Sequence, residues 1–372
     1  MAMNAPQAPA LPFPLGTRPI IERIGSQTFT PGGAAIAQDL AKVGYLKGLL
    51  LRLSGTYTVV TGSPGPKAVF PYNYLARVQL DLPGLNDPYA VSGWGLKLQN
   101  FFDYPFTMAS DRNLAPIDAD QMTATQLKSA GYFAVAGDLT PVAVAANVWN
   151  LLWWIPASHN SRDFRGLLPL GNQSTATLRV FPGADADLIA TPANHSASAL
   201  TLDIFQVYFT APPGGVAAPD TTWAVVIDEY EQAIVAAGDQ VIDIPRGGII
   251  LNVVHQVRNV DTAFPIASDV AAQVDTVSFR VNRDKLWDAV PIAAKLIDMN
   301  AGRVNPLPAG TIAYDFDREQ AGVPFGDSSG ERIPGWIYSD SVNEIKSTIH
   351  VATGATLTNA KVTTTVKRLM RL

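Results

Sequence analysis

Cysteine is absent from this chain of 372 residues. Its absence excludes disulfide bridges, thiolate metal sites and a thiol nucleophile, and it leaves the redox compartment undecided. Histidine is scarce: His159, His195, His255 and His350 are scattered, with no His-x-His pair and no HExxH motif. The clustered ligands of a catalytic metal centre, such as a two-domain cupin enzyme needs, are therefore missing. We expect these histidines to be strand or interface side chains.

Charge is also low. Charged residues make up 16% of the chain, whereas a soluble domain carries roughly 25%. So little charge suggests a surface that is largely neutral or covered by other chains. The formal net charge of −5 gives no basic field, so we expect no specific nucleic-acid partner.

Long apolar runs are missing as well. No stretch approaches about 18 uninterrupted apolar residues, so no membrane-spanning helix is expected. Residues 1–16 lack the basic start and apolar core of a signal peptide. The proline-rich residues 1–17 cannot form a regular helix. They are either a disordered tail or an arm that becomes ordered on a neighbouring subunit, with Leu11, Phe13 and Leu15 as its anchors.

What the chain does contain is strand-like sequence between turns, supplied by 28 prolines and 29 glycines. The run VWNLLWWI at 148–155 stops at Pro156 and predicts a buried strand by its length and aromatic content. Residues 200–209 alternate with period two, as a half-buried strand does. One segment, 91–102, has helical spacing. Further strands are predicted at 47–60, 76–82, 175–183, 223–227, 240–244, 249–257, 311–316 and 360–370.

The order of these segments repeats. Val78 and Leu80 match Val277 and Phe279 at an offset of 199 (277 − 78), as Lys47-Gly48 matches Arg246-Gly247. Lys97-Leu98 matches Lys295-Leu296, and 148–155 matches 311–316. Leu178 and Val180 match Ile349 and Val351 at 171 (349 − 178).

The repeat predicts a fold. Both halves end on a long alternating strand, and a Pro/Gly-rich segment lies between them. We predict an all-β chain of two eight-stranded jelly-roll sandwiches in tandem, with short helices in the connections. The expected division is an arm at 1–17, a first jelly roll at 18–211, a linker at 212–221 and a second jelly roll at 222–372.

Catalytic signatures are lacking. No GxSxG, GxGxxG or Walker motif occurs. Asp185 and Asp187 have the spacing of calcium ligands, but no glycine-pivoted loop or terminal glutamate follows them. We therefore expect no enzyme activity, no metal and no cofactor.

Three segments carry a family likeness. They are QTFTP at 27–31 with VGYLKGLL at 43–50, ARVQLDL at 76–82 with SGWGLKL at 92–98, and WWIP at 153–156 with SRDFRG at 161–166 and LRVF at 178–181. The pattern resembles the double jelly-roll major capsid proteins of tectivirus-type bacteriophages, whose icosahedral shell encloses a membrane. The first half carries the motifs, and the second half matches by the order of its elements.

The resemblance implies a pseudo-hexagonal homotrimer that tiles an icosahedral virion shell and is assembled in the host cytoplasm. Its implied partners are copies of itself, penton and minor capsid proteins, and internal membrane lipids. The inserts at 103–147 and 318–345 would form intersubunit contacts or an outward tower.

Charged interface candidates follow from the same reading. Arg162, Asp163 and Arg165 in the excursion after the tryptophan strand are expected at trimer or lattice contacts. Lys367, Arg368 and Arg371 lie either on an ordinary last strand or near lipid headgroups or a partner subunit.

Two other functions are compatible with the sequence. One is a carbohydrate-binding or carbohydrate-active double β-sandwich, for which Trp336 and Asp185 are the residues to test. The other is a phage spike or receptor-binding protein, which shares the β-rich trimeric organisation.

Overall fold

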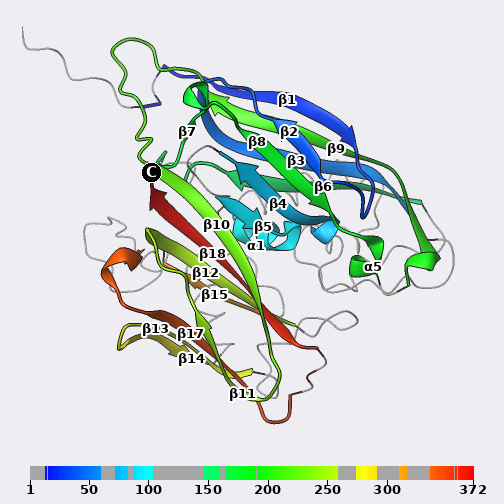
Figure 1. The fold of residues 1–372 in the computed structure, drawn as a ribbon, viewed down its shortest axis with the longest axis vertical. Helices are drawn as coiled ribbons and strands as arrows, with labels where there is room; N and C mark the ends of the chain where they lie inside the picture. Colours follow the sequence, from blue (N-terminus) through cyan, green and yellow to red (C-terminus); the bar gives the residue numbers. More distant parts are fainter. Residues whose placement is uncertain are drawn as a thin grey trace, which may run out of the picture.

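The computed structural model describes most of both halves of the chain. The described residues are 13–14, 16–59, 72–82, 88–103, 146–159, 164–189, 191–258, 274–290, 310–316, 336–355, 357 and 359–372. Strands dominate, as predicted (Figure 1). Within these residues no helix is long and apolar enough to cross a membrane.

The described part of the first half contains nine strands. They are β1 (Pro19–Thr28), β2 (Ile36–Asp39), β3 (Tyr45–Val59), β4 (Leu75–Asp81), β5 (Tyr89–Val91), β6 (Ala146–Pro156), β7 (Leu168–Pro169), β8 (Thr177–Pro182) and β9 (His195–Phe209). The helical elements are η1 (Tyr72–Tyr74), α1 (Gly93–Asp103), η2 (Leu170–Asn172), α5 (Asp185–Leu188) and η3 (Pro192–Asn194).

The second half repeats this series. Its strands are β10 (Trp223–Ala233), β11 (Gly238–Asp243), β12 (Ile249–Arg258), β13 (Val274–Val281), β14 (Asp284–Ala289), β15 (Thr311–Asp315), β16 (Ile337–Tyr338), β17 (Ile345–Val351) and β18 (Lys361–Arg371). A short helical turn, η5 (Ser339–Ser341), follows β16 as η2 follows β7.

Each half folds into two facing sheets with the same strand order. The order β1-β9-β3-β6 in the first half corresponds to β10-β18-β12-β15 in the second. The order β2-β8-β4-β5 corresponds to β11-β17-β13-β14, and the short β7 and β16 pair with the starts of β3 and β12. Two eight-stranded jelly rolls in tandem, the predicted fold, are confirmed.

The two halves also match in backbone detail. Gly44 and Gly248 precede β3 and β12, and both have positive φ, 56° and 75°. A side chain at Gly44 would overlap the carbonyl oxygen of Phe209, and one at Gly248 would overlap that of Leu369. The oxygen of Gly44 accepts a hydrogen bond from the Leu170 N–H at 3.1 Å, and that of Gly248 accepts one from the Ser339 N–H at 2.9 Å.

The register of the repeat was predicted correctly in one strand. β4 and β13 carry a bulge at Ala76 and at Asp275, an offset of 199 (275 − 76), and Val78 and Val277 follow these bulges at the same spacing. The predicted offset of 199 between β4 and β13 is therefore confirmed.

The register was wrong in two other strands. Gly44 aligns with Gly248, an offset of 204 (248 − 44), so Lys47-Gly48 does not align with Arg246-Gly247. Val180 aligns with Ile349, an offset of 169 (349 − 180), and not with Val351. Alternating apolar residues look the same after a shift of two, so the pattern alone does not fix register. Lys295-Leu296 lies outside the described residues.

Two strands differ from the prediction. β1 spans Pro19–Thr28, where no strand was predicted from the sequence. β10 continues from Ile227 to Ala233, because it pairs with β18 along its whole length. Similar dipeptides in the two strands, Ile21-Glu22 and Ile227-Asp228, were the available signal for β1.

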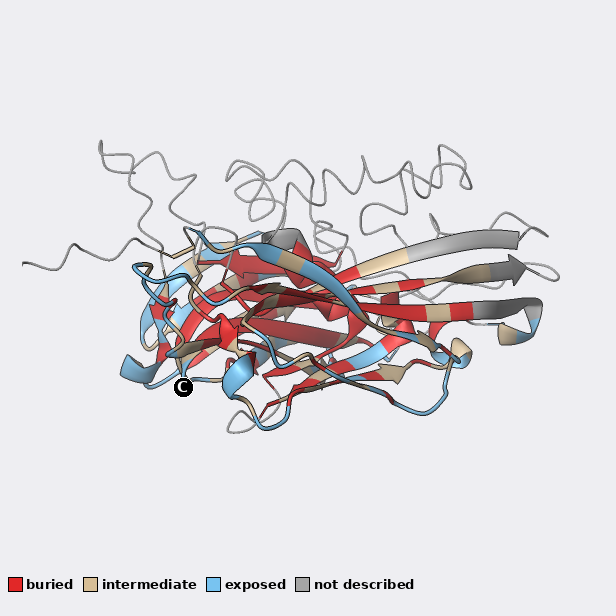
Figure 2. Ribbon diagram, turned by 90° about the horizontal axis from the view of Figure 1, so that it is seen from above, coloured by how far each residue is buried: buried red, intermediate tan, exposed pale blue. Residues whose placement is uncertain are grey.

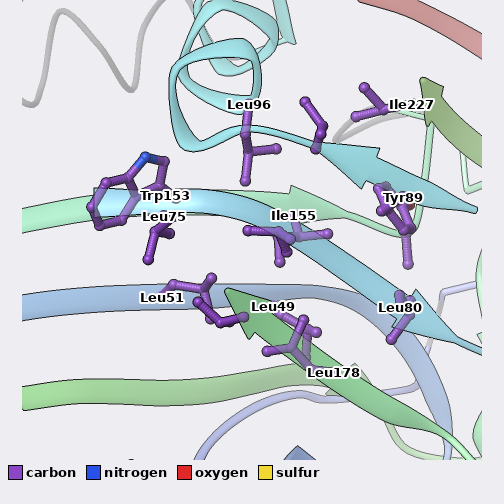
Figure 3. Close-up of a cluster of buried hydrophobic side chains, with 14 of the residues drawn as sticks. Leu49, Leu51, Leu75, Leu80, Tyr89, Leu96, Trp153, Ile155, Leu178 and Ile227 are labelled. Atoms are coloured by element: carbon purple, nitrogen blue, oxygen red, sulfur yellow. The ribbon is translucent and has the colours of Figure 1, made fainter. Parts of the chain in front are cut away.

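Each jelly roll has its own hydrophobic core. The first gathers alternate residues of β3, β4, β6, β8 and β9 around the buried Trp153, and Figure 3 shows this side chain near Leu51 and Leu75. The second is built around Tyr314, Phe279 and Phe316. Trp153 thus fills core volume, in agreement with the buried strand predicted at 148–155. Figure 2 shows the buried strands in the interior, between exposed segments.

The two jelly rolls are joined through a continuous sheet. β5 of the first pairs in parallel with β10 of the second, Tyr89 opposite Ile227 and Ala90 opposite Asp228. α1 lies over the second jelly roll, where the Trp94 indole N–H donates to the side-chain oxygen of Gln256. The path β15-β12-β18-β10-β5-β4-β8-β2 therefore crosses from one half to the other (Figure 1).

Candidate subunit-interface surfaces

The outer face of the β10-β18-β12-β15 sheet is covered by the first jelly roll. All ten residues of β12 are buried, on both faces of the strand. Ile227 of β10 is 0% exposed and pairs with Tyr89 of β5, which lies below it in Figure 3. This face is therefore the junction between the two halves.

Glu229 is a half-buried acidic group at this junction. It accepts hydrogen bonds from the Ser92 hydroxyl at 2.8 Å and the Ser92 N–H at 3.3 Å. Burial raises the pKa of Glu229 above its ordinary value, while the Ser92 hydrogen bond and the charge of Arg258 oppose the rise. Arg258 itself pairs with Glu231 at 3.0 Å. A methyl group on Gly95 would overlap the Glu229 carboxylate, so the glycine makes room for it.

The equivalent outer face of the β1-β9-β3-β6 sheet is much less covered. Ile21 on β1, the counterpart of Ile227, is 69% exposed. Leu50, Phe205 and Trp154 form a row across β3, β9 and β6 on this face, and each is half-buried. We call this surface the outer sheet face.

Charge on the outer sheet face is concentrated in one cluster. Asp203 lies 3.7 Å from Arg23 and 3.5 Å from Arg52. Asp203 is nearly buried, whereas the side chain of Arg23 is largely exposed. The neighbouring row of Leu50, Phe205 and Trp154 is apolar.

Phe13 of the predicted arm contacts its own jelly roll. Its ring lies 5.3 Å from those of Phe164 and Phe209 and 6.2 Å from that of Tyr45, in edge-to-face geometry. Such pairs stabilise by roughly 0.5–1.5 kcal/mol each. Its role as an anchor on a neighbouring subunit stays a prediction. Leu11 and Leu15 lie outside the described residues.

Arg165, in the connection that follows β6, also makes its contacts within the chain. The guanidinium of Arg165 lies 4.5 Å from the ring centre of Trp336, and His159 contacts the same ring at 5.6 Å. These contacts link the connection after β6 to the start of β16. Arg162 and Asp163 lie outside the described residues, so their interface role stays a prediction.

The three C-terminal cations differ in exposure. Lys367 is 1% exposed and donates to the carbonyl of His159 at 3.1 Å. Arg368 donates to the carbonyl of Arg246 at 2.9 Å and pairs with Asp228. Arg371 is exposed and lies close enough to Asp220 to contribute to lowering its pKa, which the hydrogen bonds from Thr222 lower most. Contact of these three with lipid or a partner subunit stays a prediction.

Possible metal ligands do not gather in the described part of the chain. Among the described residues, no three His, Asp or Glu side chains gather as metal ligands. His255 donates or accepts one hydrogen bond with Thr364 at 2.8 Å, and burial lowers its pKa to about 3. His350 lies by Asp239 at 2.7 Å. Asp185 accepts from the Tyr74 hydroxyl at 3.1 Å.

Two eight-stranded jelly rolls of identical strand order, joined side by side in one chain, define the double jelly-roll fold. This is the fold of the major capsid proteins of icosahedral viruses to which the chain is structurally similar. The resemblance drawn from the sequence is thereby confirmed at the level of fold, and the tectivirus type is one member of that group.

Individual solved structures match over nearly the whole chain. The crystal structure of the STIV MCP, from Sulfolobus Turreted Icosahedral Virus, has a TM-score of 0.67 at 15% identity and covers 95% of this chain and 97% of its own. The PBCV-1 virus capsid has a TM-score of 0.60 at 9% identity, covering 95% and 93%. The Faustovirus major capsid protein has 0.55 at 10%, covering 95% and 90%.

Sequence comparison gives no such match. No protein-family model matches the chain, and no curated protein matches its sequence. At this identity the likeness is one of fold, carried by backbone and strand order rather than by shared side chains.

Proposed function

We propose that this chain is a major capsid protein, a structural subunit that self-assembles to tile an icosahedral virion shell. The observation that carries the proposal is the junction between the two jelly rolls. It uses two different surfaces, the α1 and β5 side of one jelly roll and the outer face of the β10-β18-β12-β15 sheet of the other.

The same two kinds of surface are left over in each chain. The first jelly roll presents its outer sheet face, and the second presents the β14 side, which corresponds to β5. A contact between two different surfaces is heterologous, and it forms a closed ring when its rotation closes. Three chains would then place six jelly rolls around one axis as a pseudo-hexagonal homotrimer.

Finer features belong to the same proposal. Residues 18–211 and 222–372 would be the two domains, with 1–17 as an arm and 212–221 as the linker. The virion would be the site of function, with assembly in the host cytoplasm. Penton and minor capsid proteins and an internal membrane are the further partners that the double jelly-roll resemblance suggests.

The oligomeric state of the purified chain tests the proposal. Size-exclusion chromatography with light scattering is expected to give three times the chain mass of 39.7 kDa. Negative-stain images are expected to show hexagonal plates or shells. A stable monomer at micromolar concentration would overturn the proposal.

The excursion gives a second test. Reversing Arg162 and Asp163 together is expected to reduce assembly and leave the circular dichroism spectrum and unfolding midpoint unchanged. Arg165→Glu is a less clean variant, because it also removes the contact with Trp336. Normal assembly of the Arg162/Asp163 variant would remove these two residues from the interface.

A further inference from the structure

Among the described strands that end a sheet, two have counterparts in the other half that are paired with each other. β1 ends the β1-β9-β3-β6 sheet, and β14 ends the β11-β17-β13-β14 sheet. In the repeat, β1 corresponds to β10 and β14 corresponds to β5. β10 and β5 are the strands that bridge the two jelly rolls in parallel.

The register assigns each counterpart residue. Ile21 pairs with Val207 as Ile227 pairs with Lys367. β3 and β12 place Val207 and Lys367 at equivalent positions, next to a bulge at the same point of each strand. Ile21-Glu22 therefore corresponds to Ile227-Asp228, an offset of 206 (227 − 21).

The other edge follows in the same way. Val78 pairs with Val91, as Val277 pairs with Ala289. Val91 therefore corresponds to Ala289. The two residues before each of them then also correspond: Tyr89 to Trp287 and Ala90 to Asp288, an offset of 198 (287 − 89). The intrachain bridge Ile227–Tyr89 and Asp228–Ala90 thus has an unused copy, Ile21–Trp287 and Glu22–Asp288.

We propose that β14 of one copy of this chain pairs in parallel with β1 of a neighbouring copy, in the register Ile21–Trp287 and Glu22–Asp288. The occupant of the outer sheet face is thus the second jelly roll of another copy. The inference rests on the proposed function and specifies its subunit contact.

Exposure supports a second copy as the occupant. Tyr89 and Val91 of β5 are buried against β10, whereas four of the six residues of β14 are exposed. Leu286 and Val290, in and beside β14, are each 48% exposed, and Ile21 is 69% exposed. The edges of β5 and β10 are buried because these strands pair with each other. The corresponding edges of β14 and β1 have no such partner among the described strands and are exposed.

Polar groups at the two edges are compatible with the contact. Asp288 forms an ion pair with Lys285, and Glu22 accepts a hydrogen bond from the Tyr208 hydroxyl at 3.3 Å. The two carboxylates that face each other in the proposed register thus each have a partner of their own. Unpaired strand edges also template the addition of another strand.

Engineered disulfides test the register directly, because the natural chain has no cysteine. Cα atoms of directly paired residues in adjacent strands lie about 5 Å apart, within the range a disulfide spans. Oxidised Glu22→Cys/Asp288→Cys is expected to give bands of one, two and three linked chains on non-reducing gels. Asp228→Cys/Ala90→Cys is the matched control and is expected to form an intrachain disulfide at monomer mass.

The outcomes separate this contact from the proposed function. A trimer in which Glu22→Cys/Asp288→Cys does not cross-link would overturn the register and leave the capsid proposal standing. A monomeric natural chain would overturn both. Linked dimers from Glu22→Cys alone would show that β1 pairs with itself and would also refute the contact.

A non-covalent variant gives an independent check. Ile21→Lys is expected to weaken self-association at least about tenfold, because a charge replaces an apolar side chain at the contact, while the unfolding midpoint of the separated chain is unchanged. Val235→Lys is the control, since Val235 is 89% exposed and lies outside the outer sheet face. Unchanged trimer stability in Ile21→Lys would refute the contact.

Discussion

The outer faces of two equivalent sheets differ in composition, and the more apolar one is the less covered. Trp154, Leu152 and Phe205 on the first sheet correspond to Ala313, Thr311 and Thr365 on the second. The second face is buried inside the chain, whereas those three residues of the first are only half-buried.

Covalent linkage explains this difference. Two jelly rolls in one chain meet at a high effective concentration, so small and polar side chains are sufficient at their junction. Separate chains must offset the lost translational and rotational freedom of association by the contact itself. Large apolar groups on the first face are therefore consistent with a surface that meets another chain.

The strongest test of the equivalence between the two halves is a pair of glycine substitutions. Gly44→Val and Gly248→Val are each expected to lower the free energy of unfolding by about 3 kcal/mol or more, because both combine positive φ with overlap of a backbone oxygen. Urea unfolding would measure both. Gly215→Ala is the control, expected to cost about 1–2 kcal/mol, since its φ is also positive but nothing lies within 4 Å. If only one of the two valine variants lost much of its free energy of unfolding, Gly44 and Gly248 would not be equivalent positions.

The junction can be probed by a double-mutant cycle. Gly95→Ala is expected to destabilise by about 2 kcal/mol, because the overlap with Glu229 outweighs the better helix propensity of alanine. In a Glu229→Ala background the same change should cost at least about 1 kcal/mol less. Additive effects in thermal or urea unfolding would show that the two residues do not compete for space.

Acid should affect the second core more than the first. His255 occupies the position that Leu51 has in β3, and burial lowers its pKa to about 3. The unfolded chain binds a proton below about pH 6.5 while the folded chain does not, so stability falls as the pH drops from 6.5 towards 3. His255→Leu is expected to reduce the stability difference between pH 7 and pH 5 by about 2 kcal/mol. An unchanged pH dependence would contradict this.

The smallest effect is expected at Glu229. Its raised pKa means that the folded chain keeps a proton to higher pH than the unfolded chain. The resulting stability is present below pH 4.5 and is lost as the pH rises through the folded-state pKa. Glu229→Gln should therefore be about 1 kcal/mol more stable than the natural chain at pH 8 and equal at pH 4. The reverse trend in paired unfolding curves would assign Glu229 a stabilising charge.

The fold could be predicted because local patterns and element order agree. Alternation in 200–209, the aromatic run ending at Pro156 and the offset of 199 between Val78 and Val277 were sufficient for a double jelly roll. Strand register was less accessible, since bulges at Lys47 and Leu251 shift the pairing without a sequence signal.

The candidate surface was largely missed for a related reason. Ile21 lies in a strand whose edge position leaves it without a clear alternating pattern, so no strand was predicted there. Nothing in the sequence around Glu229 predicts its hydrogen bonds with Ser92, just before α1. Lys367 was expected either on an ordinary last strand or near lipid or a partner subunit, and β18 buries it within the chain. Such properties depend on which sheet face another element covers.

Gly44 and Gly248 also bear on the history of the chain. Each is constrained by a main-chain oxygen, of Phe209 or Leu369, and not by the side chain that carries it. Mutation could therefore exchange phenylalanine for leucine on the facing strand without relaxing the requirement for glycine. If the two halves arose by duplication of one gene, glycine at these two positions would be retained longer than most side chains, because the constraint comes from the backbone.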